Sequence, residues 1–258
     1  MNTDDFEARM RALEYFHTLK LLPGARTVIR VDGRGFSRFT ASRFEKPFDA
    51  RFSELMATTA QALLDEFQGI YAYTESDEIS VLFPPSWNIF DRELEKLVSL
   101  SAACASSAFT LAAGERAMFD SRIWVGVTEQ DVVDYFRWRQ ADAARCALNG
   151  WAYWTLRHEG MNAAQATNLL DHQSVGFKNE LLFQRGINFT DVPEWQRRGL
   201  GLYWETYEKE GFNPLTQQAV TATRRRIKVD RNLPVREDYS AFIRALMATP
   251  ESRDMGAK

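Results

Sequence analysis

Residues 71–83 read Tyr71-Ala72-Tyr73-Thr74-Glu75-Ser76-Asp77-Glu78-Ile79-Ser80-Val81-Leu82-Phe83, and this stretch decides the fold. Two runs of β-branched and aromatic residues flank a short acidic turn, which is the pattern of a β-hairpin. Hairpin tips usually carry Asn or Gly, which accept positive φ at little cost, but this tip carries the carboxylates of Glu75, Asp77 and Glu78. Their mutual repulsion favours a cation among them, and Mg²⁺ takes hard oxygen ligands. A solvated acidic turn is the ordinary alternative.

A second carboxylate upstream favours a bound cation over a solvated acidic turn. The apolar segment 27–31 predicts a strand that ends in Asp32-Gly33-Arg34-Gly35-Phe36, and glycines let a backbone approach a ligand closely. If this strand lies beside the hairpin, Asp32 and Asp77 face a common point. Together with the carbonyl of Gly33 they would form a two-metal site, which clamps the attacking and leaving oxygens in phosphoryl transfer. A polymerase palm and a nucleotide cyclase both have this geometry, and fold analogy does not separate them.

The order of the elements predicts an α+β fold with a polymerase-palm-like or cyclase-like antiparallel sheet. Strand, helix, hairpin, helix and strand give a ferredoxin-like βαββαβ core, with flanking helices expected on one face and a C-terminal hairpin extension. We expect residues 1–160 to form a palm-like catalytic domain with an N-terminal helix, and residues 161–258 to complete one continuous unit. The predicted segments are helices at 4–20, 49–67, 92–112, 130–159 and 161–170, strands at 27–31 and 121–127, and a hairpin of 200–207 with 220–229.

Composition sets further bounds. The 258 residues fit one large domain, and a hydrophobic content of 45% supports a substantial core. No apolar run approaches the roughly 20 residues of a membrane span, and the acidic N-terminus lacks a signal-peptide pattern, so we expect a cytoplasmic protein that is not bound to a membrane. Cys104 and Cys146 are interpreted as reduced core thiols, and zinc is not expected. A net charge of −3 argues against a general nucleic-acid coat but permits a local basic groove.

Cations occur where a phosphate-bearing ligand is expected. Lys46 suits a triphosphate as a point charge, or it is an ordinary loop residue, and Asp49 predicts the cap of the following helix. Arg92 and Lys96 share a helix face and either reach phosphates or pair with neighbouring glutamates. In the C-terminal region, cationic residues beside Trp195 and Trp204 suit phosphate contacts and base stacking, with an exposed surface hairpin as the alternative. These residues are Arg197, Arg198, Arg224, Arg225 and Arg226.

Seven motifs occur in a fixed order between about residue 30 and residue 199: V-I-R-V-D-G-R-G-F, F-E-K-P-F-D, A-Y-T-E-S-D-E-I-S-V-L-F, F-D-S-R, D-Y-F-R-W-R-Q-A-D, K-N-E-L-L-F and G-I-N-F. In these motifs the chain resembles the histidine-tRNA guanylyltransferase superfamily, and it is most similar to the bacterial and archaeal guanylyltransferase-like branch. The resemblance implies a palm-like catalytic domain, two Mg²⁺ ions and a homotetramer. It also implies nucleotide addition to the 5′ end of tRNA, the reverse of ordinary polymerisation.

The resemblance assigns roles by position. Asp32 and Asp77 bind metal with the carbonyl of Gly33, and Ser76 and Glu78 complete the catalytic residues. The nucleotide-binding positions are Gly33, Arg34, Gly35, Phe36, Lys46, Asp49, Arg92 and Lys96. The positions tied to tRNA or to activation are Arg122, Arg139, Lys178 and Asn179, and the C-terminal region with its basic residues is expected to contact tRNA. ATP or GTP would activate a 5′-monophosphate, and the 3′-hydroxyl of an incoming nucleoside triphosphate would then attack it.

One departure from the family bears on specificity. After Arg139-Gln140-Ala141-Asp142, eukaryotic members continue with His-Ile-Asn-Asn-Leu-Tyr-Asn, whereas this chain has Ala143-Ala144-Arg145-Cys146-Ala147-Leu148-Asn149. The guanylyltransferase-like branch also lacks that stretch. We therefore expect template-dependent repair of 5′-truncated tRNA, with a dedicated histidine-tRNA guanylyltransferase as the alternative. More remote are a palm-type nucleotide cyclase and a catalytically silent tRNA-binding protein.

Overall fold

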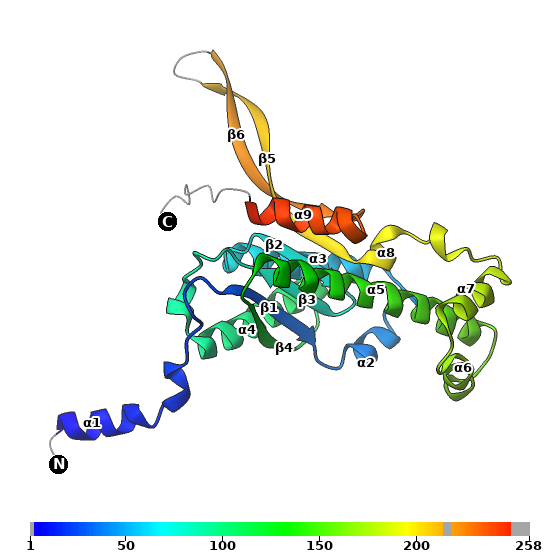
Figure 1. Cartoon of the computed structure of the whole chain (residues 1–258), viewed down its shortest axis with the longest axis horizontal. Coiled ribbons are helices and arrows are strands. Elements are labelled where there is room, and N and C mark those ends of the chain that lie inside the picture. The colour runs from blue at the N-terminus through cyan, green and yellow to red at the C-terminus, as the bar shows by residue number, and fades with distance from the viewer. Residues whose placement is uncertain (1–2, 214–217, 249–258) are drawn as a thin grey trace.

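The computed structural model describes residues 3–213 and 218–248, and within them six strands form one antiparallel sheet (Figure 1). The spatial order is β4-β1-β3-β2-β5-β6. The four strands β4-β1-β3-β2 have the order and antiparallel pairing of a ferredoxin-like βαββαβ core, so the predicted fold class is confirmed. The strands are β1 (Arg26–Gly33), β2 (Tyr71–Glu75), β3 (Glu78–Leu82), β4 (Phe119–Gly126), β5 (Leu200–Asn213) and β6 (Gln218–Asp230).

Helices cover both faces of the sheet, which corrects the expectation of one covered face. Side chains alternate along a strand, and β1 is apolar on both sides: Ile29 and Val31 pack with α3 and α4, whereas Val28 packs with α5 and α9. The helices are α1 (Thr3–Ala12), α2 (Phe36–Ala41), α3 (Ala50–Glu66), α4 (Leu94–Ala113), α5 (Glu129–His158), α6 (Ala163–Leu170), α7 (Val175–Phe183), α8 (Glu194–Arg198) and α9 (Arg236–Ala248), with 3₁₀ turns η1 (Tyr15–Thr18), η2 (Ile89–Arg92) and η3 (Phe189–Asp191).

Local sequence explains where α3 and α5 begin. Asp49 caps α3 by accepting the backbone N–H of Arg51. Thr128 and Asp131 form a capping box at the start of α5, in which each side chain accepts the other residue's backbone N–H. α5 runs for 30 residues, so it extends from the covered sheet to the region of α6 and α7. It thereby links the end of the sheet to the C-terminal region.

The C-terminal region extends the sheet and then leaves it. Residues 200–203 of β5 pair with β2, and beyond them β5 and β6 continue together as a two-stranded arm that projects from the body (Figure 1). At the other terminus, the predicted helix over 4–20 ends at Ala12, and α1, which has no buried residue, also projects from the body.

Two further expectations need correction. In the described part of the chain one helix, α4, is long and apolar enough to cross a membrane by length and composition alone, so the statement that no segment reaches that length does not hold. The same properties suit a core helix, and Leu97 and Phe109 of α4 are buried beside the sheet. Both cysteines are free, as expected, but Cys146 is exposed and Cys104 is only half-buried, so neither is a fully buried core thiol.

Candidate functional site

The acidic turn of the β2–β3 hairpin lies beside the end of β1. Glu75 and Glu78 are paired across the hairpin, so Ser76 and Asp77 form a two-residue turn. The backbone N–H of Gly33 donates to the carbonyl oxygen of Asp77 at 3.0 Å, and Asp32 is the register partner of Glu78. The antiparallel register therefore brings Asp32 and Asp77 to the same end of the sheet.

The glycine-rich turn after β1 is also required by packing. A Cβ atom on Gly33 would lie 2.4 Å from the ring of Phe36. Phe36 is buried, and its ring centroid lies 5.1 Å from that of Phe109 and 4.9 Å from that of Phe119. Gly35 precedes α2 with a φ of 76°, in the left-handed region that glycine adopts most easily. Phe36, which the resemblance placed in the nucleotide site, thus has a core side chain that also lines the base of a cavity described below.

Gly33→Ala is expected to lower the free energy of unfolding by about 1–3 kcal/mol, because the added methyl group overpacks the Phe36 ring. Urea unfolding followed by circular dichroism measures this change. Gly176→Ala is the matched control, since the nearest atom to its added Cβ would be Ser174 Oγ at an ordinary 3.8 Å. Equal stabilities of Gly33→Ala and the wild-type chain would contradict the packing role.

The electrostatic surroundings of Asp77 disfavour its charge. Burial raises the pKa of Asp77, and the charge of Asp32 raises it as well. The Ser76 hydroxyl opposes this rise by donating to Asp77 Oδ1 at 2.9 Å, and so does the charge of Lys46. Lys46 itself donates to Thr40 Oγ1 at 2.7 Å, and burial lowers its pKa. The ionised Asp77 side chain is therefore short of compensating positive charge, which a bound cation would supply.

The donor set at this end of the sheet fits a hard divalent cation. The Asp32 carboxylate has one ion-pair partner among the described residues, Arg122 at 3.9 Å, which leaves acceptor capacity on both oxygens. No group of three or more His, Cys, Asp and Glu side chains suited to a metal is found in the part of the chain that the structure describes. Mg²⁺ needs no such group, because it commonly takes one or two carboxylates and completes its shell with water and substrate phosphates. Asp32, Asp77 and a carbonyl of the Gly33 turn are able to hold it.

A cavity of about 380 Å³ opens beside Asp77 and is large enough for a small ligand. Lys46 and Asp49 line it from the loop between α2 and α3, and Cys146 lines it from α5. Asp49 is held by local contacts, since its carboxylate accepts the N–H groups of Glu45 and Arg51, and the hydrogen bond from the Arg51 side chain holds the pKa of Asp49 well below its usual range. The aromatic lining residues are Phe36, Phe44, Phe48, Phe52, Trp154 and Trp195.

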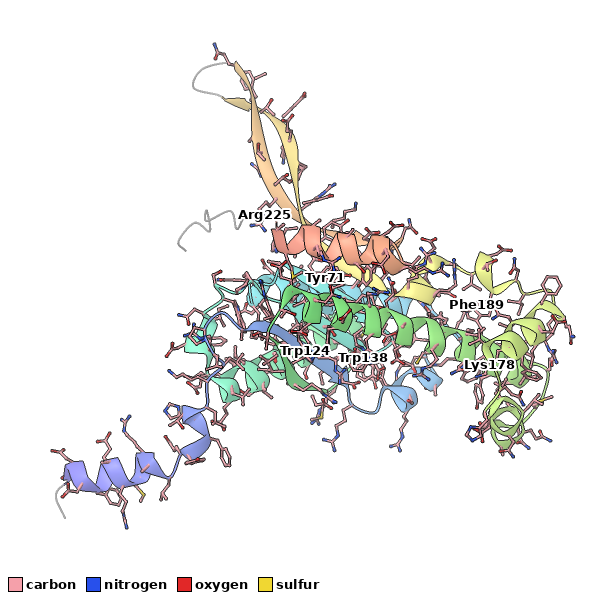
Figure 2. All side chains as sticks on the ribbon, viewed as in Figure 1. Tyr71, Trp124, Trp138, Lys178, Phe189 and Arg225 are labelled. Carbon is pink, nitrogen blue, oxygen red and sulfur yellow. The ribbon has the colours of Figure 1, made fainter. Side chains whose placement is uncertain are left out.

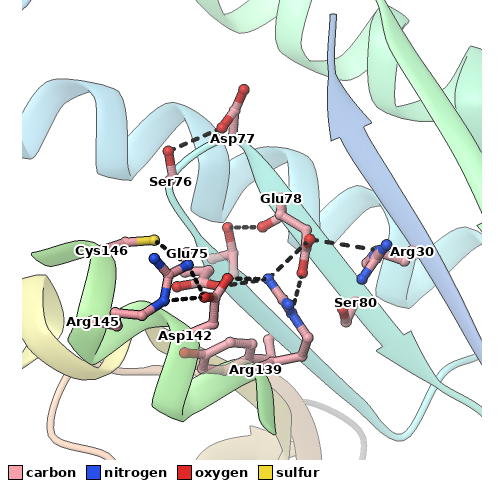
Figure 3. Close-up of polar contacts among 12 residues, drawn as sticks. Arg30, Glu75, Ser76, Asp77, Glu78, Ser80, Arg139, Asp142, Arg145 and Cys146 are labelled. Carbon is pink, nitrogen blue, oxygen red and sulfur yellow. Dashed lines mark hydrogen bonds and ion pairs between the residues drawn. The ribbon is translucent and has the colours of Figure 1, made fainter. Parts of the chain in front are cut away.

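Arg139 lies beneath the turn rather than on an RNA-accessible surface (Figure 3). Its side chain is 8% exposed, and its Nε donates to Glu78 Oε1 at 2.7 Å. Its Nη2 donates to Glu75 Oε1 at 2.8 Å. Burial raises the pKa of Glu75 to about 8 and also raises the pKa of Glu78, while the charge of Arg139 opposes both rises. The expected tRNA contact of Arg139 is therefore corrected to a buried ion-pair role.

Arg92 and Lys96 do not line the cavity of their own chain. Ser106 of α4 accepts the N–H of Phe119, which is the register partner of Gly33. Lys96 lies ten residues earlier in the same helix, about 15 Å towards the opposite end of the sheet, where Lys96 pairs with Glu93 at 2.8 Å. Arg92 donates to Asn88 Oδ1 at 2.6 Å in that same region. Their expected nucleotide contact is thus not made within one chain, and they have the alternative role of local pairing partners.

The residues expected to contact tRNA are dispersed. Arg122 flanks the acidic site and pairs with Asp120 at 2.9 Å. Lys178 and Asn179 lie on α7 at the far end of α5, well away from Arg225 on the arm (Figure 2). The Arg197 and Arg198 side chains are half-buried and donate to backbone carbonyls at 2.8 Å and 2.9 Å. A ligand that touched all of these positions would have to be as extended as a nucleic acid.

The arm combines positive charge with aromatic rings. Arg225 lies 4.6 Å from the ring centroid of Trp204, and Arg226 lies 5.0 Å from that of Tyr207. The Arg224, Arg225 and Arg226 side chains are exposed. Stacked guanidinium groups and aromatic rings at a surface suit the phosphates and bases of a nucleic acid.

Reasoning from sequence missed two parts of the site. Glu75 was counted among the acidic turn residues but not as the partner of Arg139, because a contact over 64 positions leaves no local pattern. The aromatic wall formed by Phe44, Phe48 and Phe52 was visible as a four-residue spacing, but that spacing also suits an ordinary buried helix face.

Comparisons with known proteins agree with this geometry. The family model described as tRNAHis guanylyltransferase (Thg1) matches residues 7–127, and a model of the Thg1 C-terminal domain matches residues 130–243. A tRNA(His) guanylyltransferase of Debaryomyces hansenii is 34% identical over 228 residues, which are 81% of this chain and 86% of that protein. A probable tRNA(His) guanylyltransferase of Drosophila melanogaster is 36% identical over 191 residues, 69% of this chain and 67% of that protein. The solved structure of a bacterial Thg1-like protein in complex with ATP has a TM-score of 0.75 at 26% identity and covers 94% of this chain and 99% of that one.

Proposed function

The chain belongs to the tRNAHis guanylyltransferase family and is a nucleotidyltransferase, and from this premise we propose that it adds nucleotides to the 5′ end of tRNA at the site formed by Asp32 and Asp77. The observation that carries the proposal is the convergence of these two carboxylates beside a cavity lined by Lys46 and aromatic rings. Bacterial relatives of the same fold are described in complex with GTP and with ATP, which supports a nucleoside triphosphate as the occupant of the cavity.

Each group in the site has a distinct task in this chemistry. Asp32 and Asp77 would hold Mg²⁺, which would neutralise phosphate charge and lower the pKa of the attacking hydroxyl. Lys46 presents positive charge to the triphosphate from within the cavity. The aromatic lining excludes water and offers faces on which a base stacks. Positioning and charge stabilisation carry most of phosphoryl transfer, so the protein needs no covalent intermediate.

The proposed reaction has two transfers. An oxygen of the tRNA 5′-monophosphate attacks the α-phosphorus of ATP or GTP, and pyrophosphate leaves. The 3′-hydroxyl of an incoming nucleoside triphosphate then attacks the activated 5′-phosphorus, and the nucleoside monophosphate leaves. A new phosphodiester bond therefore joins the added nucleotide to the former 5′ end.

Guanine addition to histidine tRNA is the specificity that the relatives support best, because the curated relatives carry that name. This support favours the alternative over the template-dependent repair that the sequence led us to expect. Template-dependent repair remains the second candidate function because one observation supports it. Ala143, Cys146 and Ala147 line the cavity from α5 within the segment where the His-Ile-Asn-Asn-Leu-Tyr-Asn pattern is absent. Small side chains there offer few groups for selecting guanine. The homotetramer stays a prediction from the resemblance, and the cytoplasmic location stays a prediction from the composition and the N-terminal sequence.

Two 5′-labelled, monophosphorylated tRNA transcripts distinguish these specificities in the presence of Mg²⁺, ATP and the four nucleoside triphosphates. One transcript is full-length histidine tRNA, and the other lacks its first acceptor-stem nucleotide. We expect the intact tRNA to gain guanine whatever base stands opposite if the enzyme matures histidine tRNA. Preferred, template-matched extension of the truncated tRNA would instead assign repair. Extension of neither transcript, with both still bound, would contradict nucleotide transfer altogether.

Charge neutralisation of the arm by Arg224→Gln, Arg225→Gln and Arg226→Gln together is expected to weaken tRNA binding and to flatten its salt dependence. Each lost phosphate contact reduces the slope of log K against log salt by roughly 0.7–0.9, so three contacts amount to about two to three units. Filter binding of tRNA at KCl concentrations from about 50 to about 300 mM measures the slope. Arg9→Gln with Arg11→Gln on exposed α1 is the control. An unchanged slope would make the arm an ordinary surface hairpin.

A further inference from the structure

Arg139 joins both ends of the acidic turn with one guanidinium group. Its Nε and Nη2 donate to the two oxygens of Glu78 at 2.7 and 3.1 Å, and Nη2 also donates to Glu75 at 2.8 Å. The two glutamates are the residues immediately before and after Ser76-Asp77, and their side chains are 10% and 13% exposed. Figure 3 shows Glu75 and Glu78 pointing towards Arg139 and Asp77 pointing away from it.

The turn has no strong conformational preference of its own. Glu75 and Glu78 are directly opposite each other in the ladder, where like charges repel. Ser76 has a φ of 48° in a two-residue turn where Gly, Asn or Asp would be favoured. A cation between the two glutamates therefore stabilises the turn, in addition to the hydrogen bonds that Thr74 Oγ1 donates to the Glu78 carbonyl and the Gly33 N–H donates to the Asp77 carbonyl. A planar guanidinium suits two carboxylates at fixed angles better than an ammonium group does.

Further contacts orient Arg139 itself. Asp142, one helical turn later, accepts from Nη2 at 3.2 Å and also pairs with Arg145. The guanidinium carbon lies 4.6 Å from the ring centroid of Trp138. α5 then continues as a wall of the cavity through Cys146 and Gly150. One rigid helix thus holds the acidic turn and lines the ligand cavity.

We propose that Arg139 is a positioning residue that holds the β2–β3 turn in the conformation in which Asp77 faces a divalent cation. It acts through Glu75 and Glu78 and touches neither tRNA nor nucleotide. The proposal rests on the proposed function in one respect, namely that Asp32 and Asp77 bind a divalent cation. It adds that Arg139, carried by α5, acts as a clamp on the turn and thereby controls the affinity of that site for the cation.

Direct binding of Mn²⁺, measured by electron paramagnetic resonance on the full chain without nucleotide, tests the clamp. Arg139→Lys keeps the charge but loses the fork, and we expect it to bind Mn²⁺ about 10- to 100-fold more weakly, the usual effect of removing a group that orients a metal ligand. A second variant, Glu75→Gln with Arg139→Gln, removes one charge of each sign and so protects folding. Weaker Mn²⁺ binding is expected there too. Affinities are compared for the folded fraction, determined by circular dichroism.

The sign of a third change separates positioning from simple electrostatics. Arg139→Gln alone removes positive charge near the cation, so electrostatics by itself would strengthen Mn²⁺ binding, whereas loss of the clamp weakens it. Arg137→Lys on the same helix is the matched control, because Arg137 pairs with the exposed Glu237. It should leave the affinities for Mn²⁺ and tRNA within about twofold of the wild-type values, which is roughly the measuring error. Three outcomes would each overturn the clamp. They are wild-type affinity for Mn²⁺ in Arg139→Lys, tighter Mn²⁺ binding in Arg139→Gln, and a selective loss of tRNA binding. Absence of saturable Mn²⁺ binding by the wild-type chain would instead overturn the proposed metal site.

Discussion

Asp77→Ala is expected to reduce nucleotide transfer by at least about 10²–10³-fold, because the variant loses a carboxylate of the proposed site for a charge-neutralising metal. Binding of tRNA is expected to remain within a few fold, since the basic residues of the arm and of α7 lie elsewhere on the chain. Single-turnover transfer to a 5′-labelled tRNA and filter binding of the same tRNA measure the two quantities. Their divergence identifies a chemical role for Asp77.

Stability provides an independent readout of the same substitution. Burial raises the pKa of Asp77, which means that the folded chain disfavours the ionised form. Asp77→Ala is therefore expected to unfold at an equal or higher temperature than the wild type in the absence of metal, as often happens when a strained functional residue is removed. Asp65→Ala, at an exposed position of α3, controls for the loss of a carboxylate and should retain transfer. Loss of tRNA binding with transfer intact per bound tRNA would refute the assignment.

Arg139→Met is expected to cause the largest loss of stability, about 3–5 kcal/mol, because it removes the cation that the buried Glu75 and Glu78 share and leaves only Arg30, at 3.5 Å from Glu78, as a partner. Urea unfolding at neutral pH measures the loss. The double variant Arg139→Met with Glu75→Gln should recover part of it, since one of the unpaired charges is removed. Additive effects of the two substitutions would contradict the direct pairing of Arg139 and Glu75.

The loss caused by Arg139→Met is also expected to depend on pH. In the intact chain burial raises the pKa of Glu75 to about 8 and raises that of Glu78, with the charge of Arg139 opposing both. Without Arg139 both folded-state pKa values rise further. A carboxyl group with a raised folded-state pKa contributes stability below its unfolded pKa and loses that contribution as pH rises through the folded-state pKa. The deficit of the variant should therefore be smaller near pH 5 than near pH 8, and an equal deficit at both would contradict this mechanism.

Several features of the site were accessible from sequence because they depend on short-range patterns. The hairpin around Asp77 is visible in the alternation of apolar residues about a turn. The strand that ends at Asp32 is visible in an apolar run followed by glycines. Since the βαββαβ order leaves few topologies, the proximity of Asp32 to Asp77 followed from these two local patterns.

Other features depended on which surfaces meet. α9 had no predicted counterpart, although its Tyr239 and Ile243 are fully buried and its Tyr239 hydroxyl lies 3.0 Å from that of Tyr71. Arg92 and Lys96 have the charge and spacing of phosphate ligands, but Lys96 lies in the first turn of α4 and Arg92 lies before it in η2, away from the acidic end of the sheet. Charge and spacing specify which side chains can interact, and the direction of the helix decides what they reach.

By itself the sequence indicated the βαββαβ succession of the core, the two carboxylates that follow its strands and the family of the chain. These follow from the local spacing of apolar, acidic and glycine residues, and each pattern needs only a few neighbouring positions. Only the tertiary structure decided that helices cover both faces of the sheet and that Arg139 joins Glu75 to Glu78 beneath the turn. The reason is physical: burying a guanidinium requires partners from distant segments, and only the folded chain brings them within hydrogen-bond distance.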